Sequence, residues 1–94
     1  MRRTPLKRRS LKRDRFQREL DAITPALMER AEYRCEVGIM DCSGAFHRHH
    51  KLMRSHGGTN ELSNLVWCCD RCHSFVHRHP EWSYARGWLI RGVA

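Results

Sequence analysis

Four of the five cysteines are spaced so that they could hold one metal ion. They fall into two pairs, the first with six residues between its members and the second in C-x2-C spacing: Cys35 and Cys42, then Cys69 and Cys72. Two thiolate pairs separated by a long insertion are typical of a tetrahedral four-cysteine zinc site, which needs no open coordination position. The alternatives are buried thiols without a metal and a redox-active C-x2-C pair. Cys68 directly precedes Cys69, and we interpret it as a small buried hydrophobic residue.

Histidines form a second group that could bind a metal or transfer a proton. His73 and His77 are four residues apart in a segment predicted to be helical, so both side chains lie on one helix face. His49 and His50 lie upstream on a predicted strand and could supply a third ligand and a general base, since imidazole binds ions such as zinc and nickel and exchanges a proton near neutral pH. Adjacent side chains on a regular strand face opposite ways, so both can enter one site only at a strand end or a distortion. His47 shares the face of His49 and is the alternative ligand or base.

The elements that must position these residues follow from caps, breakers and apolar runs. Thr24 and Pro25 form a helix start, Pro80 ends one helix and can begin another, and Gly87 can close the second. Glycines and polar residues over 56–60 predict a loop. The predicted elements are helices over 14–22 and 24–33, strands over 45–51 and 65–68, helices over 70–79 and 80–86, and a final strand over 88–90. The three tryptophans are interpreted as core residues.

Chain length and cysteine usage restrict the class of protein. The 94 residues fit one domain, and a core this small is often stabilised by a metal or by disulfides. The sequence shows no signal peptide and no apolar run long enough to span a membrane, so we expect a reducing, cytoplasmic setting. Grouped cysteines there are better interpreted as metal ligands than as disulfides, and the odd number of cysteines agrees.

Basic residues are concentrated at the N-terminus. The net charge is +8, and nine of the 18 lysines and arginines lie in the first 18 positions: Arg2, Arg3, Lys7, Arg8, Arg9, Lys12, Arg13, Arg15 and Arg18. Such a balance predicts a polyanionic partner. We predict a basic, flexible arm over 1–13 that contacts phosphates, followed by a folded domain over 14–94. A membrane partner is not expected, because the arm has no broad apolar face.

Several of these segments together match a known pattern. HHKLMRSHGG over 49–58, NLV over 64–66 and CDRCH over 69–73, followed by His77, resemble the HNH endonuclease family. The resemblance is greatest to small phage-encoded members, and it extends over about residues 24–92. It implies an α+β fold: a small ββα-metal (His-Me finger) domain with a four-cysteine structural zinc and flanking helices.

The resemblance also implies roles for individual residues. His50 matches the general base, and His49, His73 and His77 match the ligands of one catalytic divalent metal, which could be Mg²⁺, Mn²⁺, Ni²⁺ or Zn²⁺. Asn64 matches the middle residue of the pattern, which braces the loop and orients the base. Many members carry Asp where His49 stands, and a three-histidine site favours softer ions than Mg²⁺.

The implied activity is metal-dependent hydrolysis of phosphodiester bonds in DNA, by nicking or cutting the duplex, with 5′-phosphate and 3′-hydroxyl products. The resemblance further suggests a phage setting in the cytoplasm of a bacterial host, in genome packaging beside a terminase. Arg48, Lys51 and Arg54 are candidate phosphate contacts, although solvated surface charges would look the same.

Two other functions are alternatives for this sequence. A non-catalytic zinc-finger DNA-binding module would need the basic arm and the cysteines but not the histidines, so the histidines favour the enzyme. An RNA-binding or RNA-cutting protein is not supported by any pattern of base-stacking aromatic residues.

Overall fold

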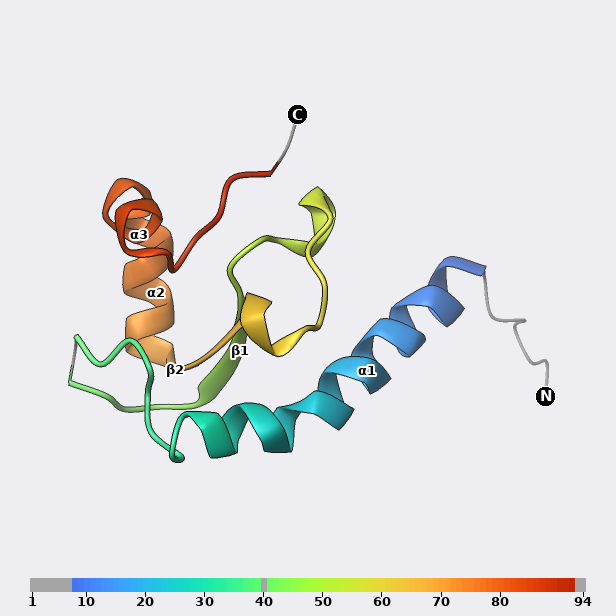
Figure 1. Ribbon diagram of the computed structural model, residues 1–94, viewed down its shortest axis with the longest axis horizontal. Coiled ribbons are helices and arrows are strands. Elements are labelled where there is room, and N and C mark those ends of the chain that lie inside the picture. The colour runs from blue at the N-terminus through green and yellow to red at the C-terminus, as the bar shows by residue number, and fades with distance from the viewer. Residues whose placement is uncertain (1–7, 40, 93–94) are drawn as a thin grey trace, which may run out of the picture.

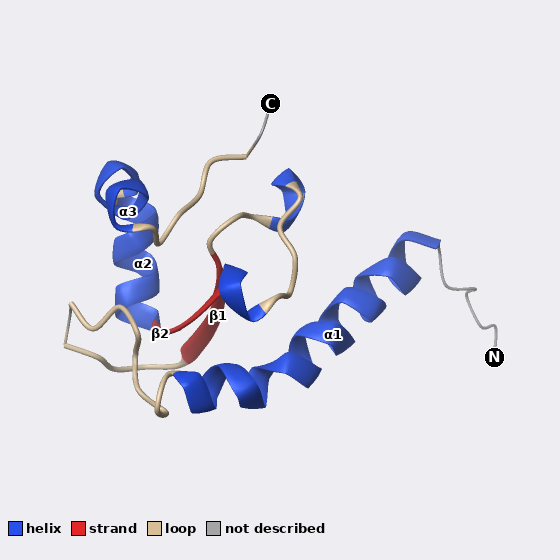
Figure 2. Cartoon of the chain, viewed as in Figure 1, coloured by secondary structure: helices blue, strands red, loops and turns tan. Residues whose placement is uncertain are grey.

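The computed structural model describes residues 8–39 and 41–92. Within these residues, two antiparallel strands pack with three helices, as Figures 1 and 2 show. In chain order the elements are α1 (Arg8–Arg30), β1 (Phe46–His50), 3-10 turns at Arg54–His56 and Leu62–Asn64, β2 (Leu65–Cys69), α2 (Asp70–Arg78) and α3 (Pro80–Arg86). The predicted fold class is confirmed: this is a small α+β fold in which β1, β2 and α2 form a ββα unit.

The register of the two strands decides which way each histidine faces. His47 lies opposite Cys68, His49 opposite Val66 and His50 opposite Leu65. Residues Leu65, Val66, Cys68 and Cys69 are buried, so β2 is covered on both faces and its register is well specified. A slip by one residue would turn His49 away from the core. The register therefore directs His49 toward the core and its neighbour His50 toward the opposite face of the strand.

Helix α1 is one continuous helix, where the sequence predicts two helices that meet at Thr24 and Pro25. Pro25 lies inside it, and the Thr24 hydroxyl donates a hydrogen bond to the Leu20 carbonyl at 2.6 Å. Leu20 and Leu27 are buried on either side of the proline against Leu65, so packing holds both halves in one helix despite the missing amide hydrogen. The axis of the helix changes direction part-way along its length (Figure 1).

The beginning of α1 falls within the expected arm. Residues 8–13 are helical, although they fall within the segment predicted to be flexible. Lysine, arginine and leucine are good helix formers, and no glycine or proline interrupts this stretch. The basic residues of the predicted arm that precede α1 lie outside the described residues; they are Arg2, Arg3 and Lys7.

The C-terminal end of α1 is fixed to the ββα unit by one arginine. The Arg30 guanidinium donates to the Leu62 and Leu65 carbonyls, each at 2.6 Å, and pairs with the Glu36 carboxylate at 2.7 Å. Glu36 in turn accepts from the Trp67 amide at 2.8 Å. These bonds join α1 and Glu36, which directly follows Cys35, to β2, and they explain why a helix outside the ββα unit keeps a defined place beside it.

A second core lies between β2, α2 and the chain that follows α3. Val66, Cys68, Val76 and Leu89 are buried there, and Trp82 and Trp88 pack against them. Trp67 packs against the α1 cluster, so all three tryptophans contribute to packing, as predicted. The Ser83 hydroxyl is buried and donates to the Val76 carbonyl at 2.7 Å, which ties α3 to α2.

Residues 88–90 do not form the predicted strand. Gly87 ends α3 in the left-handed region, and the amides of Trp88 and Leu89 turn back to bond the Ser83 carbonyl. Within 88–90, the one backbone hydrogen bond to the region of β1 runs from the Ile90 amide to the Lys51 carbonyl at 2.8 Å. No helix within residues 8–39 and 41–92 combines the length and apolar character required to span a bilayer.

Candidate active site

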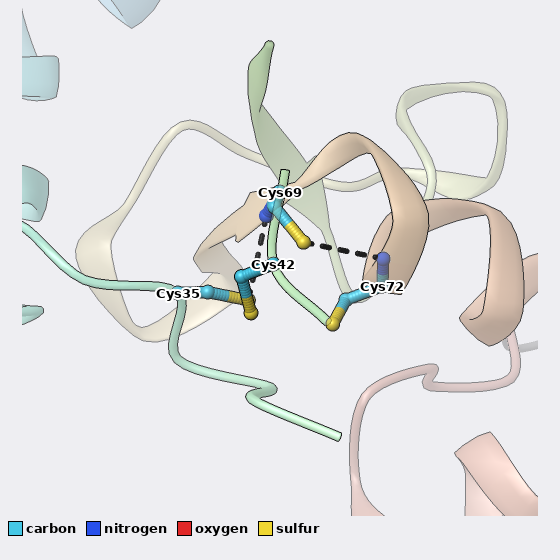
Figure 3. A group of neighbouring side chains, drawn as sticks. All are labelled: Cys35, Cys42, Cys69 and Cys72. Atoms are coloured by element: carbon cyan, nitrogen blue, oxygen red, sulfur yellow. Dashed lines mark hydrogen bonds between the residues drawn. The ribbon is translucent and has the colours of Figure 1, made fainter. Parts of the chain in front are cut away.

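The four paired cysteines meet at the base of α2. Each offers one sulfur, and the four ligand atoms of Cys35, Cys42, Cys69 and Cys72 all lie within 4.8 Å of one another (Figure 3). Cys69 ends β2 and caps α2, where its sulfur accepts from the Cys72 amide at 3.4 Å. Cys35 accepts from the Cys69 amide at 3.4 Å and from the Gly38 amide at 3.3 Å. Amide donors around the sulfurs are those that a thiolate cluster requires.

The protonation of these thiols fits a bound cation. Although burial acts against it, hydrogen bonds from the Cys72 amide and from neighbouring thiols lower the pKa of Cys69 to about 7. Desolvation and hydrogen bonds to Cys69 and Cys35 raise the pKa of Cys42 to about 12. One thiolate is therefore favoured at the expense of its neighbours, and a divalent cation would allow all four to ionise. A soft, four-sulfur set of this size fits structural zinc.

Cys68 is not part of this group, which agrees with its interpretation from the sequence as a small buried hydrophobic residue. It is fully buried in the core, and burial raises the pKa of its thiol to about 12. The thiol of Cys68 is therefore neutral at physiological pH, and this residue packs as a small apolar side chain.

Three histidines form a second group on the other side of α2. The candidate ligand atoms of His49, His73 and His77 lie within 4.8 Å of one another, and Nε2 of His73 is 3.2 Å from Nε2 of His77. His73 and His77 share one face of α2, one helical turn apart, while β1 brings His49 to them. Cys72 and His73 are adjacent on the helix, yet they join different groups because neighbouring helical residues point about 100° apart.

The electrostatics of this triad favour neutral imidazoles. Burial lowers the pKa of His49, which is 3% exposed, and burial together with the neighbouring histidines lowers the pKa of His73 to about 4. Nε2 of His49 lies 2.7 Å from the Trp88 carbonyl, which can only accept, so Nε2 carries the proton and Nδ1 carries the lone pair. A histidine ligand whose other nitrogen donates to a carbonyl is the usual arrangement at a metal site. The donor set therefore fits one divalent cation.

His50 leaves β1 on the opposite face, as expected for the neighbour of His49. Its ring stacks on Phe16 of α1 with centroids 5.6 Å apart, and its Nε2 lies 2.8 Å from Oδ1 of Asn60. The conflict expected from strand geometry is resolved because β1 ends at His50, and both histidines border one open cavity of about 220 Å³. That cavity is lined by Arg48, His49, His50, Met53, Arg54, His73 and His77.

Asn64 braces the loop between the strands. Its amide accepts from the Leu52 backbone at 2.8 Å and donates to the carbonyls of Leu52 and Thr59 at 3.1 and 2.9 Å. The loop closes tightly here, since a Cβ at Gly58 would lie 1.8 Å from the Leu52 oxygen. The side chain that bonds His50 directly is that of Asn60, which the sequence analysis did not single out. No spacing rule marks this asparagine among the polar loop residues.

His47, the alternative ligand or base, lies beside the triad. Its ring stacks on His73 with centroids 4.5 Å apart, and its Nε2 lies 2.8 Å from Oδ1 of Asp70. It thus shares the face of His49, as strand geometry predicts, but it is not part of the three-histidine group. Its partner is a carboxylate at the start of α2.

Two of the three candidate phosphate-binding residues, Arg48 and Arg54, contact side chains of α1. Arg48 forms an ion pair with Asp21 and donates to the Thr24 hydroxyl at 3.2 Å. The hydrogen bonds from Arg48 and Gln17 hold the pKa of Asp21 below its usual value. The guanidinium of Arg54 lies 4.1 Å from the centroid of the Phe16 ring. Lys51 follows β1 and is half-buried, outside the residues that line the cavity.

Comparison with known proteins adds one finding. Residues 35–79 match a family model described as HNH endonuclease. The match begins at the first cysteine of the four-cysteine group and includes all three histidines of the triad. Searches of curated proteins and of solved structures gave no significant match.

Proposed function

We propose that the chain is a metal-dependent endonuclease that hydrolyses phosphodiester bonds in duplex DNA, on the basis of the match of residues 35–79 to the HNH endonuclease family model. The observation that carries the proposal is the convergence of the three-histidine group and His50 on one cavity, with Arg48 and Arg54 at its border. A ligand set, a candidate base and phosphate-binding groups are the parts that this reaction needs.

The reaction can be assigned to the residues of the cavity. Water attacks phosphorus, the bond from phosphorus to O3′ breaks, and the leaving O3′ oxygen takes up a proton from solvent water, so that the products are a 5′-phosphate and a 3′-hydroxyl. His50 takes the proton from the attacking water as general base. Arg48 and Arg54 border the cavity and would bind phosphate oxygens there, although the Arg48 guanidinium also pairs with Asp21. His49, His73 and His77 would hold one divalent cation, which when bound stabilises the charge that develops on the phosphate and the leaving oxygen.

The four-cysteine zinc cluster has a structural role that is separate from catalysis. Its four sulfurs leave no open position for substrate, and it fixes the start of α2, where His73 follows Cys72. Occupied by zinc, the cysteines would thus set the direction of the helix that carries two ligands of the catalytic metal.

The proposal is tested by relaxation of supercoiled plasmid. Purified, zinc-loaded protein is expected to nick or linearise the plasmid when a divalent ion is added. The activity with Mn²⁺, Ni²⁺ or Zn²⁺ should exceed that with Mg²⁺, because imidazole nitrogens favour the softer ions. Absence of metal-stimulated cleavage with any of these ions, alongside retained DNA binding, would instead identify a non-catalytic zinc-finger module.

The resemblance to phage-encoded members extends the proposal to the biological setting. We place the activity in genome packaging, in the cytoplasm of a bacterial host, with a terminase as partner. Co-purification of the tagged chain with a terminase from the same phage would test this association, and nicking that is unchanged by the terminase would count against it.

Basic residues on α1 should contribute contacts that do not depend on DNA sequence. Arg15 and Arg18 are exposed on either side of Phe16, which contacts both His50 and Arg54. Replacing both by glutamine should weaken DNA binding and lower the slope of log affinity against log salt by up to about 0.9 per lost contact. The matched control is Arg78→Gln with Arg86→Gln, which removes two exposed charges from α2 and α3. If both double variants change the slope equally, α1 is no special part of the interface.

A further inference from the structure

We propose that Asn60 is a positioning residue that holds His50 with its proton on Nε2, so that Nδ1 is the nitrogen that accepts the proton of the attacking water. This inference rests on the proposed function for the role of His50, but the orientation of the ring follows from hydrogen bonds alone. It assigns a role to a loop residue outside the recognised sequence pattern.

The direction of the hydrogen-bond chain is set at its far end. Nδ2 of Asn60 lies 3.0 Å from the backbone carbonyl of Phe16 in α1. A carbonyl oxygen can only accept, so the amide must present its NH₂ group to α1. The opposite amide orientation would place two acceptor oxygens against each other. The orientation of Asn60 is therefore fixed by α1, 44 residues away in the chain.

The orientation of the amide then decides the tautomer of His50. Oδ1 of Asn60 faces Nε2 of His50 at 2.8 Å. Because Oδ1 has no hydrogen to donate, Nε2 must carry the proton, and the lone pair of the neutral ring lies on Nδ1. The Nε2–H bond is kept after Nδ1 has taken a proton, so the same contact also suits the charged ring.

A further contact restricts the rotation of this ring, and a second contact supports the first. Phe16 stacks on it at an interplanar angle of 27°, and the Phe16 ring itself is covered by the guanidinium of Arg54. His50 is thus held in its plane by an aromatic face and at one edge by an amide, and both partners depend on α1. A proton acceptor held in one orientation does not have to be reoriented at the moment of reaction.

Nuclear magnetic resonance of the full-length, zinc-loaded protein tests the orientation without any need for cleavage. In ¹⁵N-labelled protein, His50 should show a slowly exchanging Nε2–H proton and an Nδ1 with the nitrogen shift of an unprotonated ring atom. The signals are assigned by their loss in His50→Ala. Asn60→Ala should lose the protected Nε2–H proton, whereas Thr59→Ala, which removes only the loop bond to the Glu61 amide, should keep it. Finding the proton of wild-type His50 on Nδ1 would overturn the proposal.

Plasmid nicking tests the consequence. Asn60→Ala is expected to lower the nicking rate by about 10- to 100-fold at nearly unchanged DNA affinity, since a misplaced catalytic group costs about that much. Thr59→Ala should stay within about two-fold of wild type, and thermal unfolding confirms that both variants are folded. If Asn60→Ala nicks at the wild-type rate, Asn60 does not position the base. If the wild type does not nick at all, the proposed function fails, while the resonance experiment still decides whether Asn60 holds His50.

Discussion

Replacing His50 with alanine is expected to lower the rate of plasmid nicking by about 10²–10⁴, the usual effect of losing a general base. DNA affinity and zinc content should change little, because a base acts on the attacking water and not on the bound phosphate. His50 also lies away from the cysteine cluster and is only partly buried, so its loss leaves both cores intact. The measurement is relaxation of supercoiled plasmid at matched protein and metal concentrations.

Other histidine variants separate the base from the metal ligands. His73→Ala and His77→Ala should also be inactive, but they should lose the divalent metal of the triad while keeping the structural zinc. Asn64→Ala should be intermediate, because it braces the loop without contacting His50. His56→Ala, an exposed histidine outside the cavity, is the matched control and should nick at the wild-type rate. Equal rates for His50→Ala and wild type would transfer the role of base to His47.

Removal of zinc from the cysteine cluster is expected to unfold most of the domain. The segment 35–39 and 41–45 contains no helix or strand, and two of the four sulfur ligands, Cys69 and Cys72, are part of the buried core. Structural zinc contributes about 10–16 kcal/mol in small zinc-binding peptides, while a whole domain is stable by only about 5–15 kcal/mol. A strong chelator, or Cys42→Ser, should therefore abolish the cooperative thermal transition.

The control for this experiment uses the fifth cysteine. Cys68→Ala removes a buried thiol that is not part of the cluster, so it should keep one equivalent of zinc and a cooperative transition at a modestly lower temperature. Metal analysis after a mild chelator should show that the zinc remains while metal at the histidine triad is lost. A metal-free protein that melts cooperatively at the wild-type temperature would show that the cluster does not hold the fold together.

The parts of this protein that depend on local spacing could be predicted from the sequence. Cys69 and Cys72 lie at the strand-to-helix junction, and His73 and His77 on one helix face, because three- and four-residue separations have a fixed geometry in a helix. The opposite directions of His49 and His50 follow from the two-residue period of a strand. The order β1, β2, α2 and α3 followed from apolar runs, Pro80 and Gly87. The four-cysteine group was therefore predictable from spacing, and the ββα fold from the resemblance to the HNH endonuclease family.

Contacts between residues far apart in the sequence could be identified only in the tertiary structure. Buried Leu20 and Leu27 keep α1 continuous through Pro25, which outweighs the local preference for a helix start. The Trp88 carbonyl selects the tautomer of His49. Local rules predict a strand over 88–90, but after Gly87 the chain turns back and bonds the Ser83 carbonyl instead. Phe16 of α1 and Asn60 of the loop between the two strands meet at His50. Such contacts depend on where whole elements pack, and no periodicity within a single segment encodes them.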